Sequence, residues 1–171
     1  MGGLTVVYDS EMDINNLSND EARKLIAEEK NPTNVLEYQE IINDIEESLI
    51  PLSAHTYRCK VKDRKRHIIY QFQIHSTPIS TRFSIGLMFC ENHVHLIRLD
   101  FGNDLRHTNN YGSDNEEVIY GSHAHINSSA SKYSVKNVIP IGQIDDFKNL
   151  KRIKEVLIQF IKYTNIKENR R

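Results

Sequence analysis

Two histidines, His123 and His125, alternate within the short run IYGSHAHIN, and His107 precedes them in the polar segment NDLRHTNN. If SHAHI is a strand, both imidazoles of the pair project from one face, because successive side chains of a strand alternate between its faces. Imidazole exchanges protons near neutral pH and is also a common metal ligand. The spacing is therefore compatible with acid/base or anion-binding chemistry, with a metal site, or with purely structural histidines.

A zinc site would need three or four ligands. The residues that could complete one around the pair are His107, Asp100, Asp104, Glu116 and Glu117. The two cysteines, Cys59 and Cys90, lack the spacing of zinc ligands. We therefore expect a site without a metal or another cofactor, and we keep a zinc-dependent hydrolase as a further hypothesis.

Arg98 and Asp100 share one strand face in HLIRLDF if this segment is extended. Aliphatic neighbours make both side chains partly buried, and buried charges need partners. The two could simply pair with each other, or they could hold an anion and orient a histidine. Arg106 and Lys132 are further cations that could stabilise negative charge, whereas His93 and His95 form a second alternating pair that we interpret as exposed edge histidines.

Nucleophile and nucleotide motifs are absent, since the chain contains no GxSxG, SxxK, P-loop or GxGxxG pattern. What remains is a set of residues suited to acid/base cleavage without a covalent intermediate, as in a small metal-independent ribonuclease. The predicted catalytic residues are His107, His123, His125, Arg98 and Asp100.

The elements that must position these residues can be predicted from periodicity. Residues 17–50 are expected to be helical, with a capping box from Ser18 to Glu21, a stop at Asn31-Pro32 and a second helix ending before Pro51. Residues 1–16 are interpreted as a leader or an edge strand. From residue 53 the apolar residues alternate with polar ones, which indicates half-buried strands.

Residues 53–141 are predicted to form an antiparallel meander of about five to six strands, interrupted by a polar loop at 102–117. A C-terminal amphipathic helix over 145–165 should pack on one face of this sheet. The fold class is α+β, and we expect residues 1–171 to form a single domain with N-terminal helices, the sheet and the closing helix.

The charge composition limits which classes of partner the chain could attract. The chain has 22 basic and 23 acidic residues, so its net charge of −1 gives no overall attraction to nucleic acid. The basic stretch KVKDRKRH (60–67) and the acidic stretch NDIEESL (43–49) could both be solvated surface segments. Alternatively, the basic stretch could form a hairpin that contacts phosphates. The few cysteines, together with the lack of a signal peptide or a long apolar run, lead us to expect a cytoplasmic protein without membrane contact.

The block LIRLDF (96–101) followed by RHTNNYGSDNEEVIYGSHAHI (106–126) resembles a family of uncharacterised bacterial and phage proteins. The core of that family reads LLRLD, HxNPDG and PHLHIY, and the resemblance extends from residue 17 to about 165. The matching positions are Arg98, Asp100, His107, Asn109, Gly112, His123 and His125. Here NNYG replaces Asn-Pro-Asp-Gly, and the proline before and the tyrosine after the histidine pair are missing. More distantly, the block looks like TumE-type toxins of toxin-antitoxin pairs, which would imply an RNA-directed toxin.

Two functions are carried forward. The first is a toxin-like ribonuclease, or a degenerate relative, whose partners would be RNA and an antitoxin. The second is a non-enzymatic protein of a mobile element that binds and inhibits a host defence nuclease, as an anti-CRISPR protein does. In the second case the basic hairpin and the acidic helix would form the interface, and the histidines would be structural.

Overall fold

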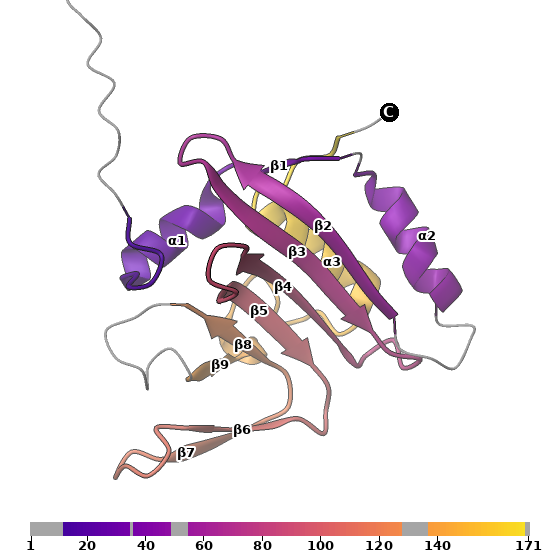
Figure 1. The fold of residues 1–171 in the computed structure, drawn as a ribbon. Coiled ribbons are helices and arrows are strands. Elements are labelled where there is room, and N and C mark those ends of the chain that lie inside the picture. The colour runs from indigo at the N-terminus through magenta and orange to yellow at the C-terminus, as the bar shows by residue number, and fades with distance from the viewer. Residues whose placement is uncertain (1–11, 35, 49–54, 128–136, 170–171) are drawn as a thin grey trace, which may run out of the picture.

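The computed structural model describes residues 12–34, 36–48, 55–127 and 137–169, and it has the predicted α+β class (Figure 1). Its three α-helices are α1 (Asn19–Ala27), α2 (Tyr38–Ser48) and α3 (Ile153–Tyr163). The strands are β1 (Asn31–Pro32), β2 (His55–Asp63), β3 (Ile68–Ser76), β4 (Phe83–Phe89), β5 (His95–Phe101), β6 (Arg106–Asn109), β7 (Glu117–Tyr120), β8 (His123–Ile126) and β9 (Val138–Pro140).

The main sheet is larger than the five to six strands predicted. Seven strands lie in the order β1-β2-β3-β4-β5-β8-β9, and all neighbours are antiparallel. The predicted loop 102–117 is partly wrong, because Arg106–Asn109 form β6, which pairs with β7 in a separate two-stranded sheet. The prediction missed β6 because the asparagines and the glycine at the tip of this hairpin indicate a turn but do not indicate where strand pairing begins on either side of it.

The predicted helices exist with shorter bounds. The capping box is confirmed, since the Ser18 hydroxyl accepts a hydrogen bond from the Glu21 amide at 3.1 Å and the Glu21 carboxylate accepts one from the Ser18 amide at 2.8 Å. The C-terminal helix begins at Ile153, not at 145, because residues 144–150 form successive tight turns closed by short-range backbone hydrogen bonds. Residues 1–11 lie outside the described part of the chain, and residues 12–16 form no strand.

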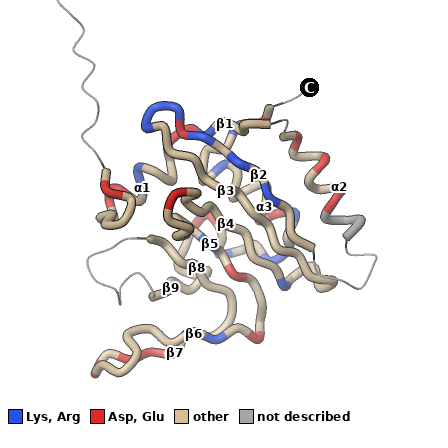
Figure 2. Tube along the Cα trace, in the orientation of Figure 1, with Lys and Arg blue, Asp and Glu red and all other residues tan. Residues whose placement is uncertain are grey.

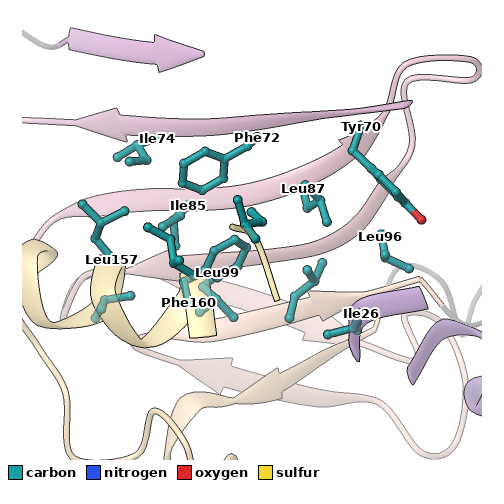
Figure 3. Packing of buried hydrophobic residues seen from close by; sticks show 14 of the residues in the cluster. Ile26, Tyr70, Phe72, Ile74, Ile85, Leu87, Leu96, Leu99, Leu157 and Phe160 are labelled. Carbon is teal, nitrogen blue, oxygen red and sulfur yellow. The ribbon is translucent and has the colours of Figure 1, made fainter. Parts of the chain in front are cut away.

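The core lies between α3 and one face of the sheet. Leu157 and Phe160 of α3 point toward the apolar side chains of the central strands (Figure 3), and the Phe160 ring stacks on Phe72 at 5.9 Å between centroids. Helices α1 and α2 contribute further buried residues to the same core. Among the described residues, no helix combines the length and the apolarity needed to cross a bilayer.

Figure 1 looks onto the opposite face of the sheet, with α3 behind the strands. The strand register aligns the side chains of this face in rows, because directly paired residues project to the same side. One row is Arg58, Gln73, Gly86, Arg98 and His125, and the next is Thr56, His75, Ser84, Asp100 and His123. Four of the predicted site residues therefore lie on this one surface, which we call the open face.

Candidate functional site

The structure brings all five predicted site residues together. Strands β5 and β8 are neighbours in which Arg98 pairs with His125 and Asp100 with His123. His107 arrives from β6, and its ring centroid lies 5.6 Å from that of His123 and 5.4 Å from that of His125. The register of β5 and β8, together with the position of β6, places the three imidazoles close enough to act on one group.

Asp100 is the centre of the cluster. Its Oδ2 accepts hydrogen bonds from Nε and Nη2 of Arg98 at 3.1 and 2.8 Å and lies 3.1 Å from Nε2 of His125. His123 Nε2 is 3.6 Å from the same oxygen. Burial acts to raise the pKa of Asp100, but the hydrogen bonds from His125 and Arg98 and the guanidinium charge outweigh it and hold that pKa below its usual value. Asp100 is thus an anion at neutral pH.

His125 has a partner for each of its protonation states. Its Nε2 lies 3.0 Å from Nη2 of Arg98 and 3.1 Å from Oδ2 of Asp100. A guanidinium only donates hydrogen bonds and a carboxylate only accepts them, so Nε2 can accept from Arg98 when it is bare or donate to Asp100 when it is protonated. An imidazole held in this way can gain and lose a proton without moving.

His123 is held more tightly. Its side chain is only 6% exposed, and Nδ1 lies 2.9 Å from the Gly121 carbonyl oxygen, which requires a proton on Nδ1 and turns Nε2 toward Asp100. Gly121 makes the turn from β7 into β8 with a φ of 83°, a conformation that favours glycine. This turn sets where the His123 ring sits, and its burial indicates a positioning role.

The β6–β7 hairpin that carries His107 is anchored by asparagines. The buried Asn109 side chain donates to the Val138 carbonyl at 2.9 Å and accepts from the Val138 amide at 2.8 Å, as a strand neighbour would. Asn137 also hydrogen-bonds both the side chain and the backbone amide of Asn110. The asparagine at position 109, one of the matching positions in the sequence resemblance, thus holds His107 over β8.

The three histidines are also the residues that could hold a metal ion. Their candidate ligand atoms lie within 4.8 Å of one another. Tetrahedral zinc with Zn–N bonds of 2.0–2.1 Å would need nitrogens about 3.4 Å apart, so the rings would have to draw together. Two other predicted ligands have different partners, since Asp104 pairs with Arg82 at 2.8 Å and Glu116 accepts a hydrogen bond from the Gly112 amide.

Sequence reasoning misjudged two residues, His95 and Arg106. His95 was expected to be exposed but is half-buried beside the cluster, and burial, with the nearby Arg98 charge, lowers its pKa to about 4. Its Nδ1 is buried and has no hydrogen-bond partner. Arg106 faces away from the site, with its guanidinium 6.0 Å from the centre of the Tyr120 ring, and Lys132 lies outside the described residues.

Gly86 is a further residue that the sequence did not single out. A Cβ at this position would lie 3.1 Å from the Ile97 carbonyl oxygen, 3.2 Å from His95 Nδ1 and 3.3 Å from Cγ of Arg98. Glycine therefore leaves room for the Arg98 Cγ beside β4, from where the side chain reaches Asp100 and His125. The nearest sequence signal is the isolated glycine within a strand pattern, which marks a close approach.

If the cluster catalyses an acid/base reaction, Gly86→Ala should slow that reaction about tenfold by displacing Arg98 a few tenths of an ångström, with little loss of stability because alanine is the better strand residue. Turnover and thermal unfolding would be measured side by side. Gly142→Ala is the matched control, since no atom lies within 4 Å of the Cβ it would add. Equal activity of both variants would show that the position of Arg98 is unimportant.

A groove of about 640 Å³ opens directly beside Asp100. Its polar lining includes His75 and Ser84, which share a row of the open face with Asp100, and its apolar walls are Ile79, Phe83, Phe101 and Leu105. Its volume is within the range of small-ligand sites. A flat apolar ring could enter this groove while a group attached to it reaches the cluster.

Fold and site together define an α+β protein with a covered apolar sheet face and a histidine, arginine and aspartate cluster on the open one. The chain belongs to a family of unknown function, DUF6978, whose model matches residues 17–166. This agrees with the predicted membership of an uncharacterised family and with the predicted extent. Comparison with curated proteins and with solved structures finds no match.

Proposed function

We propose that this protein is a toxin-like ribonuclease, or a degenerate relative of one, that cleaves RNA by acid/base catalysis without needing a metal ion. The observation that carries the proposal is the contact of one His125 nitrogen with both a permanent donor and a carboxylate, beside a second accessible imidazole. The distant resemblance to TumE-type toxins supports RNA as the substrate. The expected location is the cytoplasm, where RNA is found.

In the proposed step, Nε2–H of His125 donates to Asp100, and the other ring nitrogen, Nδ1, takes the proton of a ribose 2′-hydroxyl, whose oxygen attacks the adjacent phosphorus. The bond from phosphorus to the 5′-oxygen breaks, and His107 gives its proton to that oxygen. The products are a 2′,3′-cyclic phosphate and a 5′-hydroxyl, so the step needs no co-reactant. Two imidazoles within hydrogen-bond reach of one phosphate are what this chemistry requires.

Arg98 is the residue suited to the charge that builds up on phosphorus, because its guanidinium lies beside the base and is always protonated. Asp100 then has a positioning role. It fixes Arg98 through two hydrogen bonds and stabilises the protonated form of His125. His123 is buried, is hydrogen-bonded to the Gly121 carbonyl and forms one side of the site.

The test is incubation of the purified full chain with a single-stranded RNA in the presence of EDTA, with the product ends analysed by mass spectrometry. We expect cleavage that survives the chelator and leaves 2′,3′-cyclic phosphates. The variant His123→Ala, His125→Ala, purified in the same way, controls for contaminating nucleases. Added Zn²⁺ should inhibit, because it would occupy the imidazole lone pairs.

Two results would contradict the proposal. Cleavage that EDTA abolishes and Zn²⁺ restores would instead assign the three histidines to a metal-dependent hydrolase. RNA that stays intact, together with normal growth of cells expressing the wild type, would remove the nuclease and leave the inhibitor of a host nuclease as the remaining hypothesis.

A further inference from the structure

The edge of the open face carries a row of cations on β2. Arg58, Lys60 and Lys62 occupy alternate positions of this strand and therefore project to one side, the side of Arg98. The first two are exposed and the third is half-buried. None of the three forms an ion pair within the described part of the chain. Figure 2 shows the basic residues following β2 and continuing into the β2–β3 turn.

The rest of this face has almost no negative charge. Between β2 and the cluster, the side chains on β3 and β4 are neutral or histidine: Ile69, Gln71, Gln73, His75, Ser84 and Met88, with Gly86 adding none. The only carboxylate in the paired rows is Asp100, and Arg98 neutralises it. A surface with unpaired cations at one edge and an arginine and histidines at the other is complementary to an extended polyanion.

The spacing of the strands sets how long that polyanion must be. From β2 to β8 there are four strand separations, or ~19 Å at about 4.8 Å each. This distance spans a few nucleotides of a single strand, at the short end of the site sizes of sheet-based single-strand binders. The groove lies beside the cluster end of this path, next to Asp100, and could take a base next to the phosphate at the cluster.

We propose that the open face binds single-stranded RNA across strands β2 to β8, with phosphates on Arg58, Lys60 and Lys62 and the strand leading to the cluster at Arg98 and His125. The identity of the polyanion rests on the proposed ribonuclease function. Binding itself does not depend on cleavage, so it can be measured separately.

The probe is a fluorescent 12-nucleotide RNA with 2′-O-methyl groups, which cannot be cleaved because it lacks the attacking hydroxyl. The test variant is Arg58→Gln, Lys60→Gln, Lys62→Gln. Its matched control is Lys151→Gln, Arg152→Gln, Lys162→Gln, which removes the same residue types from exposed positions at and near α3, behind the sheet. Affinity is read by anisotropy at several salt concentrations.

We expect the β2 variant to bind at least tenfold more weakly at low salt, and the slope of log K against log salt to fall by about 2, since each phosphate contact with a single strand contributes about 0.7. The control should stay within twofold of the wild type. Equal weakening of both variants, or of neither, would overturn the proposal. Intact binding of the probe without cleavage of unmodified RNA would keep this surface and remove the nuclease.

Discussion

Changing His125 to alanine should slow RNA cleavage by a factor on the order of 10³, because a positioned base contributes about 10² to 10⁴ to such reactions. Its Nε2 is the atom that contacts both Arg98 and Asp100, so neither His107 nor His123 can take over its position in the variant. The side chain is half-buried at the rim of the cluster, and its removal should leave the fold intact. The measurement is single-turnover cleavage with saturating protein.

The pH profile separates catalysis from packing. A base must be deprotonated and an acid protonated, so wild-type cleavage should follow a bell-shaped curve. His125→Ala should remove the rise on the acidic side, and His107→Ala should remove the fall on the alkaline side. A variant that lost activity through distortion would instead scale the whole curve down without changing its shape.

His55→Ala is the matched control, since this histidine is exposed on the outer edge of β2, far from β8 in the sheet order. It should cleave RNA at the wild-type rate. If His125→Ala retained more than a tenth of the wild-type rate while remaining folded, His125 could not be the base, and the proton would have to leave through His107 or His123.

The site could be predicted because its geometry follows from alternation along two strands. Once HLIRLDF and SHAHI are recognised as strands, Arg98 and Asp100 share a face, and so do His123 and His125. That β5 and β8 are neighbours is not a local property, since β6 and β7 separate them in the chain. His107 was grouped with these residues by its chemistry alone, and only the structure shows the strand pairing that brings them together.

Features that depend on contacts between distant parts of the chain could not be predicted from the sequence. His95 and His125 have the same local pattern, but only the paired strands show that His95 lies against Gly86 and Arg98. The start of α3 was misplaced for a related reason. Residues 145–152 continue an amphipathic pattern, yet residues 144–150 form tight turns, and the Ile153 amide donates to the carbonyl of Ser80 in the β3–β4 connection.

The stability of the fold depends on a buried amino group that periodicity could not identify. Lys30 is fully buried after α1, and its Nζ lies within hydrogen-bond distance of four carbonyl oxygens, which share its N–H donors: Leu25 at 2.7 Å, Ile26 at 3.0 Å, Glu28 at 2.7 Å and Thr164 at 2.9 Å. Burial lowers the pKa of Lys30 to about 7, against the influence of Asp63 and Glu28. One amino group thus satisfies the unpaired carbonyls at the C-terminal ends of α1 and α3.

Lys30→Met should therefore lower the free energy of unfolding by about 3 to 5 kcal/mol, because a similar volume is kept while several buried carbonyls lose their donor. Denaturant unfolding followed by circular dichroism measures this loss. Lys24→Met, on the exposed side of α1, is the control and should change stability by less than about 0.5 kcal/mol. Below the transition, Lys30→Met should still cleave RNA normally, since the Lys30 amino group lies over the Tyr70 ring on the covered face of the sheet and not on the open face. A loss under 1 kcal/mol would mean that water or a rearranged helix end satisfies these carbonyls when the lysine is absent.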